Sequence, residues 1–235
     1  MTLCAIRSAR PLVALISATT SAIGPAAAAF DRVFPEARLW NILDDRLLTE
    51  AEDSSGVTPQ LADRMKRLIW HAVAGSADGI LLTCSQYGFV SKAVDVSVPI
   101  QAPDDAAFAE VLARRFGTVL IVASLRSALA DTTERLTAAV TEAAIPVGLD
   151  EICTADVAST AAARDYPELS RTLSALIQMR APQPDAVLLA QYSLAPVAET
   201  LQSMTGKPVL SGPVCAARHL RADLLHPPNA ARPCA

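Results

Sequence analysis

Residues 78–88 read Asp-Gly-Ile-Leu-Leu-Thr-Cys-Ser-Gln-Tyr-Gly. The apolar run ends at Thr83 and Cys84, and polar residues and a glycine follow it. A short apolar run bounded by turn signals predicts a buried strand. In open α/β sheets, ligands bind where strand carboxyl ends meet helix N-termini, and such places gather anions and activate thiols. The stretch therefore predicts an α/β fold with Cys84 at a ligand site.

The same pattern occurs twice. Four pairs of matching segments lie at nearly constant spacing, between 106 and 109 positions, which indicates a duplicated unit. We predict an α/β fold of two pseudo-symmetric Rossmann-like halves, each a four-stranded parallel sheet flanked by helices, with the active site in the cleft between them. The matching pairs are Ser17 with Ser124, Asp78 with Asp185, Leu43-Asp44-Asp45 with Leu149-Asp150-Glu151, and Pro99 with Pro208.

The predicted division assigns residues 11–100 and 212–226 to the first half and 101–211 to the second, with flexible tails at 1–10 and 227–235. Apolar runs predict strands at 12–17, 39–43, 80–83, 96–100, 118–124, 146–149, 185–190 and 209–210. Capping residues and apolar periodicity predict helices at 25–34, after Thr58, after Asp104, and at 132–143, 166–179, 195–204 and 214–225.

Composition excludes several classes of protein. The chain of 235 residues has a net charge of −4, and its lysines are scattered, which argues against a nucleic-acid partner. Five separated cysteines and three histidines indicate neither a disulfide framework nor a metal site. No segment has the length of a membrane span. We expect no metal, no cofactor, no membrane association, a cytoplasmic location and possible homo-oligomers.

The N-terminus has an alternative interpretation. Arg7 and Arg10 precede an apolar segment at 11–18, which is the general layout of a signal peptide. The polar residues at 19–21 interrupt that segment early, and residues 12–17 have a counterpart later in the chain. We therefore favour a strand at this position.

Two strand motifs stand at matching places in the halves: Leu82-Thr83-Cys84-Ser85 and Leu189-Ala190-Gln191-Tyr192-Ser193. Together with the order of elements, they resemble the aspartate/glutamate/hydantoin racemase superfamily. Maleate isomerases and arylmalonate decarboxylases are relatives of that superfamily. The resemblance extends from about residue 11 to 225. It implies a catalytic cysteine after the third strand of each half. Cys84 matches the first position, but Gln191 occupies the second.

This difference limits the chemistry. Two-base inversion of a carbon acid needs two groups that exchange protons, and a glutamine amide cannot titrate. One thiol can still protonate an enediolate after decarboxylation, attack a double bond or attack an acyl carbon. We predict a cofactor-independent racemase- or isomerase-like enzyme that acts on a small carboxylate-bearing carbon acid through Cys84. The alternatives are a one-cysteine decarboxylase or lyase, and a non-catalytic protein that binds a small acid.

Polar residues next to the strand ends are candidates for holding the substrate. Hydroxyl and amide groups at such positions can bind a carboxylate or an enediolate oxygen, although caps, turns and packing also explain them. The predicted substrate-binding residues are Ser17, Thr19, Ser85, Gln86, Ser124, Ser127, Gln191 and Tyr192.

Overall fold

A computed structural model describes residues 10–226 and divides them into two compact units. Unit 1 comprises residues 10–102 and 217–226, and unit 2 comprises residues 103–216. Apart from Arg10, the predicted tails at 1–10 and 227–235 lie outside the described residues.

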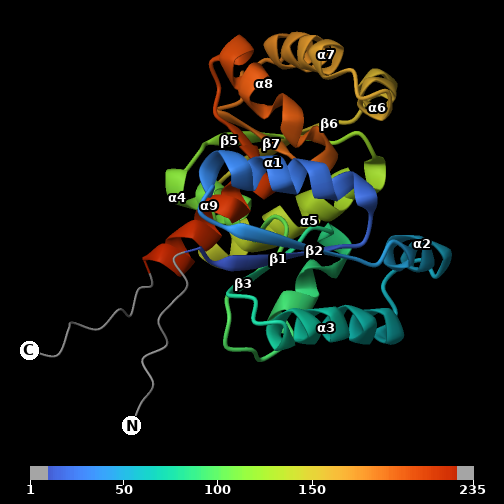
Figure 1. Ribbon diagram of the computed structural model, residues 1–235. Helices are drawn as coiled ribbons and strands as arrows, with labels where there is room; N and C mark the ends of the chain where they lie inside the picture. The colour runs from blue at the N-terminus through green and yellow to red at the C-terminus, as the bar shows by residue number, and fades with distance from the viewer. Residues whose placement is uncertain (1–9, 227–235) are drawn as a thin grey trace, which may run out of the picture. The chain divides into compact units, whose positions relative to one another are not determined.

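Unit 1 contains a four-stranded parallel sheet in the order β2-β1-β3-β4. Helices α1 and α3 lie along opposite faces of this sheet (Figure 1). The first ladder aligns Ser17 with Leu43, and the second aligns Ile16 with Leu82. The strands and helices of unit 1 are β1 (Leu12–Ser17), η1 (Thr20–Ala22), α1 (Ile23–Val33), β2 (Arg38–Leu43), α2 (Arg46–Asp53), α3 (Pro59–Ala74), β3 (Gly79–Leu82), η2 (Ser85–Lys92) and β4 (Ile100–Gln101).

Unit 2 repeats this topology in a second parallel sheet, in the order β6-β5-β7-β8. The predicted fold class of two four-stranded parallel sheets flanked by helices is therefore confirmed. The elements of unit 2 are α4 (Asp105–Arg114), β5 (Thr118–Val122), α5 (Arg126–Ala143), β6 (Gly148–Ile152), α6 (Ala155–Ala162), α7 (Tyr166–Gln178), β7 (Ala186–Leu189), η3 (Tyr192–Val197), α8 (Ala198–Thr205) and β8 (Val209–Ser211). Helix α9 (Gly212–Leu225) begins in unit 2 and continues into unit 1.

Each unit has its own apolar core. In unit 1, alternate residues of β1 and β3 pack with Met65, Ile69 and Tyr87. In unit 2, alternate residues of β5 and β7 pack with Leu169 and Leu173 of α7. Strands β3 and β7 are buried along their whole length, because helices cover both faces of a parallel sheet. This explains why the central strands are continuous apolar runs in the sequence.

The repeated aspartates Asp78 and Asp185 have the same structural task. The Asp78 carboxylate accepts a hydrogen bond from the Leu12 backbone N–H at 2.7 Å, and Asp185 accepts one from the Thr118 N–H at 2.9 Å. Each carboxylate thereby accepts the first N–H of an inner strand, β1 or β5, at the N-terminal end of the sheet. The aspartate recurs in both units with this same structural role.

We expect Asp78→Ala to lower the free energy of unfolding by about 1–3 kcal/mol, because it leaves a strand N–H without its charged acceptor. Urea denaturation measures this loss. Asp63→Ala is the matched control, since Asp63 forms an exposed ion pair with Lys66, and its effect should stay within about 0.5 kcal/mol. Equal effects of the two variants would contradict this role for Asp78.

Several element boundaries differ from the prediction. In place of the strand expected at 96–100, the structure has Ile100–Gln101. Pro99 has no N–H to donate to the sheet, although its carbonyl accepts from Ile80 N at 2.9 Å. The strand expected at 146–149 is shifted to 148–152, and α5 begins at Arg126 rather than at residue 132. Helices α2 and α6 were not predicted, because eight residues are too few for a clear apolar period.

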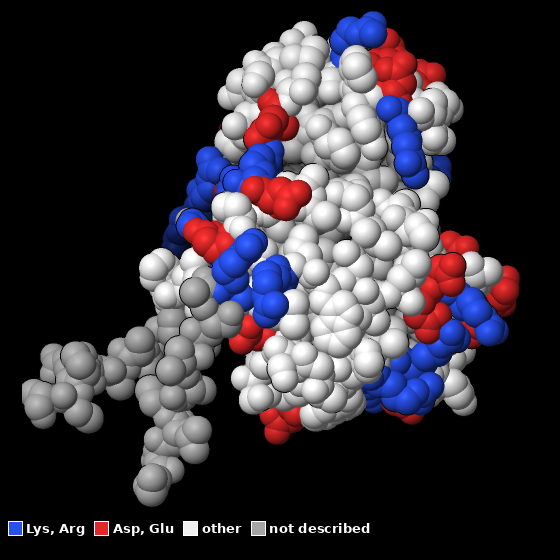
Figure 2. Space-filling model, in the orientation of Figure 1, with Lys and Arg blue, Asp and Glu red and all other residues white. Residues whose placement is uncertain are grey.

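Within residues 10–226, no helix is both long and apolar enough to cross a bilayer. On the face shown in Figure 2, lysine and arginine side chains stand beside aspartate and glutamate in clusters of mixed sign.

Candidate active site

Cys84 lies two residues beyond the end of β3 and is the N-cap of η2. Its backbone is extended, with φ −117° and ψ 120°, so the alternation of the strand continues through it. The residue is 8% exposed and packs in the unit 1 core with Leu47 and Tyr87. The chain turns into the helix here because a buried strand is followed by Ser85 and Gln86. Cys84 therefore lies at the end of a strand, as the sequence predicted.

Ser17 lies at the carboxyl end of the neighbouring strand β1. Its hydroxyl accepts a hydrogen bond from the Thr83 hydroxyl at 2.9 Å, and Ser17 is 1% exposed. Strand alternation places Thr83 and Cys84 on opposite faces of the sheet, so this hydroxyl pair and the thiol lie on different sides. Ser17 therefore joins β1 to β3 at their ends.

The other polar candidates of unit 1 fall into two groups. Thr19 caps the short helix η1, and its hydroxyl accepts from the Ser21 N–H at 3.4 Å. Ser85 and Gln86 are half-buried in the first turn of η2, and their side chains make no hydrogen bond with any residue between 10 and 226. The first N–H groups of a helix have no partner inside the helix. This turn can therefore offer donors beside Cys84.

Tyr87, in the helix η2 that follows Cys84, connects this helix to α2. Its buried hydroxyl donates to the Leu47 carbonyl at 2.7 Å. Burial is the main cause that raises the pKa of Tyr87 to about 12, and the electrostatic influence of the neighbouring Cys84, Asp44 and Glu50 adds to it. The phenol therefore stays protonated and keeps donating at neutral pH.

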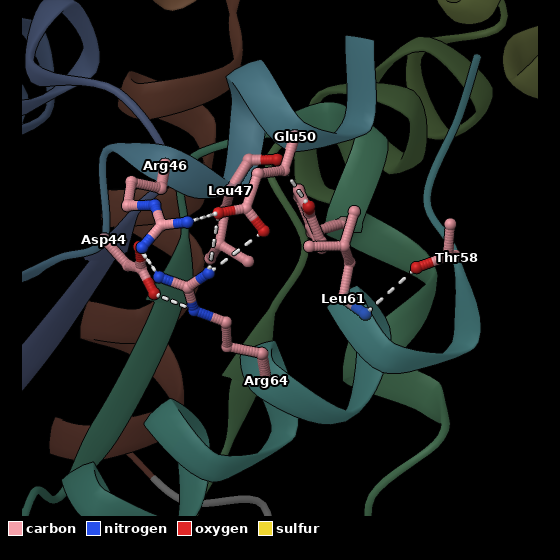
Figure 3. Close-up of polar contacts among 8 residues, drawn as sticks. Asp44, Arg46, Leu47, Glu50, Thr58, Leu61 and Arg64 are labelled. Carbon is pink, nitrogen blue, oxygen red and sulfur yellow. Dashed lines mark hydrogen bonds and ion pairs between the residues drawn. The ribbon is translucent and has the colours of Figure 1, made fainter. Parts of the chain in front are cut away.

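An ion-pair network holds the start of α2 against α3 (Figure 3). Arg64 of α3 binds both oxygens of Asp44, each at 2.6 Å, and lies 3.2 Å from the Glu50 carboxylate. Arg46 pairs with the same Glu50 at 2.7 Å. Asp44 thus contributes to structure, and its counterpart Asp150 likewise binds an arginine, Arg180, at 2.9–3.0 Å.

In unit 2, Gln191 has the position that Cys84 has in unit 1. Gln191 follows β7 and caps η3 with an extended backbone, φ −139° and ψ 142°. Its side-chain Oε1 accepts three hydrogen bonds: from Ser124 N at 2.7 Å, from Ser124 Oγ at 2.9 Å and from Leu125 N at 3.3 Å. The structure therefore brings the predicted residues Ser124 and Gln191 together. Ser127 is an exposed residue in the first turn of α5.

Tyr192 is buried, and its hydroxyl donates to the Pro103 carbonyl at 3.2 Å. Burial raises the pKa of Tyr192 well above its usual value, and the charge of Asp104 adds to the effect. The Tyr192 hydroxyl therefore already donates its proton to an acceptor within the protein. The contact supports the packing explanation of Tyr192 more than a ligand contact.

A buried ion pair, Asp104 with Arg135, lies beside Tyr192. Arg135 donates to the Asp104 carboxylate and also pairs with Asp131 at 2.9 Å. Burial raises the pKa of Asp104, while Arg135 opposes this shift. Sequence reasoning identified Asp104 as a helix start but missed the pair, because Arg135 is 31 residues away.

Gly212 lies against the same cluster. A Cβ at this position would stand 2.6 Å from the Pro103 carbonyl oxygen, 2.9 Å from the Tyr192 ring and 3.0 Å from Asp104. The backbone oxygen cannot move aside easily, so only glycine fits here.

We expect Gly212→Ala to lower the free energy of unfolding by about 1–3 kcal/mol through overpacking. Chemical denaturation measures the loss. Gly24→Ala in α1 is the matched control: its Cβ would meet nothing within 4 Å, so it should be neutral or stabilise by up to about 1 kcal/mol. The close approach would be disproved if Gly212→Ala were as stable as wild type.

Among residues 10–226, no group of three or more His, Cys, Asp and Glu side chains is placed to hold a metal ion. Within the same range, Cys84, Cys153 and Cys215 form no disulfide with one another. The Cys215 thiol lies 3.4 Å from the Glu110 carboxylate in unit 2.

No protein-family model matches the sequence, and no curated protein matches it. Solved structures do resemble it. Allantoin racemase from Klebsiella pneumoniae is 14% identical with a TM-score of 0.68, covering 92% of this chain and 88% of the racemase. Aspartate racemase from Picrophilus torridus is 13% identical with a TM-score of 0.64, covering 92% of this chain and 93% of the racemase. Unliganded arylmalonate decarboxylase is 18% identical with a TM-score of 0.56, covering 95% of this chain and 96% of the decarboxylase. The chain therefore has the two-domain α/β fold of these racemases and of arylmalonate decarboxylase.

Proposed function

We propose that this protein is a cofactor-independent, racemase- or isomerase-like enzyme that acts on a small carboxylate-bearing carbon acid through the thiol of Cys84. The position of Cys84 carries the proposal. The residue follows β3, an inner strand of the unit 1 sheet, and caps a helix whose first turn contains Ser85 and Gln86. Strand carboxyl ends in α/β sheets are where such folds bind ligands.

The thiol would act by proton transfer. The Cys84 thiolate would take the α-proton of the substrate and leave an enediolate, and the thiol so formed would return a proton to that carbon, which restores the thiolate. Donors in the first turn of η2 would hold the enediolate oxygens. Each step moves one proton and requires no oxidant or reductant.

A one-cysteine decarboxylase or lyase is the second candidate. Gln191 favours it, because an amide stands where a second proton-exchanging group would be needed for inversion. In that reaction the carbon–carbon bond to one carboxylate breaks, CO2 leaves, the remaining enediolate takes the Cys84 proton, and the thiolate regains a proton from water. A cytoplasmic location and homo-oligomers belong to the proposal on sequence grounds alone.

Proton exchange in D2O tests the proposal. Wild type and Cys84→Ala are incubated with amino acids, hydantoins, malonates and maleate, and the reactions are followed by NMR. Deuterium at the α-carbon, with or without inversion, or loss of CO2 in wild type alone supports carbon-acid chemistry. Isomerisation of maleate alone indicates covalent attack by the thiol. Binding without turnover in both proteins would replace the enzyme proposal with that of a small-acid binding protein.

A further inference from the structure

Gln191 is held in one orientation by its surroundings. Three donors at the start of α5 converge on Oε1, at 2.7, 2.9 and 3.3 Å. A flipped amide would direct its NH2 group at those three donors, so the contacts define which end of the amide is the oxygen. The Gln191 side chain is therefore fixed before any ligand arrives.

The other end of the amide has no protein partner. Gln191 Nε2 makes no hydrogen bond to any residue between 10 and 226. The buried side-chain nitrogen and oxygen atoms without a partner in that range are Thr132 Oγ1 and Ser211 Oγ, so Nε2 is not buried. Gln191 is half-buried as a whole. The fixed amide thus keeps an NH2 group that has no partner among residues 10–226 and is not closed off from solvent.

From this arrangement we propose that Gln191 is a ligand-binding residue that donates a hydrogen bond from Nε2 to a carboxylate oxygen of the ligand. The proposal rests on the proposed function for the class of ligand, a small carboxylate. An amide N–H favours an acceptor, and the positive end of the α5 dipole favours an anion. Ser124 and Leu125 act through Gln191 as positioning residues, since they fix its oxygen.

The assignment also distinguishes Gln191 from a proton-transfer group. The Nε2 group would hold a carboxylate by a hydrogen bond and would not transfer a proton to it. Gln191 would therefore determine affinity for the ligand and take no part in proton transfer. Binding and proton transfer respond differently to substitution.

Gln191→Glu tests the donor role. A glutamate keeps one oxygen for Ser124 and Leu125, and these contacts gain strength from the charge. Its second oxygen replaces the NH2 donors by an acceptor that repels a carboxylate. We expect the melting temperature to be no lower than that of wild type, while the affinity for a carboxylate falls by roughly tenfold or more. Gln202→Glu is the matched control, because Gln202 Oε1 also accepts a backbone N–H, that of Val209 at 3.2 Å.

The measurement is a titration of the full chain with malonate, with propionate and with neutral propanamide, followed by the side-chain amide signals in 15N NMR. The Gln191 signal is identified by its absence in Gln191→Glu. We expect it to shift saturably with the carboxylates and not with propanamide. The inference is overturned if a carboxylate binds without moving that signal, or if Gln191→Glu binds it as wild type does.

The outcomes separate this inference from the proposed function. Carboxylate binding through Gln191 without turnover by Cys84 would support the binding role and end the enzyme proposal. Turnover that depends on Cys84 but is unchanged in Gln191→Glu, in both kcat and KM, would support the enzyme and overturn the role of Gln191.

Discussion

Arg135→Met should lower the free energy of unfolding by about 3–5 kcal/mol at neutral pH. Asp104, with a side chain that is 7% exposed, would then be a buried carboxylate without its cation. The methionine retains the aliphatic stem that packs near Phe108, whose ring centroid is 5.2 Å from the Arg135 guanidinium carbon. The loss of stability in Arg135→Met therefore measures mainly the effect of removing the guanidinium charge.

The loss should depend on pH in a defined direction. Burial raises the pKa of Asp104 in the folded protein, and removing Arg135 raises it further. An acid with a raised folded-state pKa binds its proton more tightly when folded, so stability falls as pH rises from the unfolded pKa to the folded one. We expect the deficit of Arg135→Met to be smaller at pH 5 than at pH 7.5.

Two further variants control this experiment. Arg171→Met removes an exposed pair with Glu168 and should cost no more than about 1 kcal/mol. The double variant Asp104→Leu with Arg135→Met removes both charges and should recover part of the stability. If Arg135→Met unfolds at the same urea concentration as wild type, the pair contributes nothing.

Cys84→Ala should reduce turnover by on the order of 10³-fold, since a positioned proton donor contributes about 10²–10⁴-fold to a rate. The loss should appear in kcat, with a much smaller change in KM, because the thiol acts on the reacting carbon rather than on the carboxylate. Steady-state kinetics on the substrate found by the exchange assay measures both quantities. Cys84→Ser, which preserves the size of the side chain, should show a comparable loss.

Cys153→Ala is the control for general effects of removing a thiol, because Cys153 is half-buried and follows β6 in unit 2. It should retain wild-type kcat. Circular dichroism on all variants checks that they are folded. A Cys84→Ala protein that turns over as fast as wild type would exclude the thiol from catalysis.

The sequence alone determined the class and repetition of the fold. The continuous apolar runs at Ile80–Leu82 and Val187–Leu189 mark strands covered on both faces, and their spacing shows the duplication. These are local properties of the chain, so they can be read without contacts. Cys84 was located in the same way, because a polar turn after a buried strand defines the strand end.

Only the tertiary structure decided what the polar residues do. Ser17 meets Thr83 across 66 positions, Gln191 meets Ser124 across 67, and Arg135 reaches Asp104 across 31. Each partner comes from a different element, and hydrogen-bond geometry within about 3 Å depends on how those elements pack. The sequence offers hydroxyls and amides at the strand ends. Packing determines that the Ser17 hydroxyl is buried, that Gln191 Oε1 is fixed by three donors, and that Nε2 has no partner among residues 10–226.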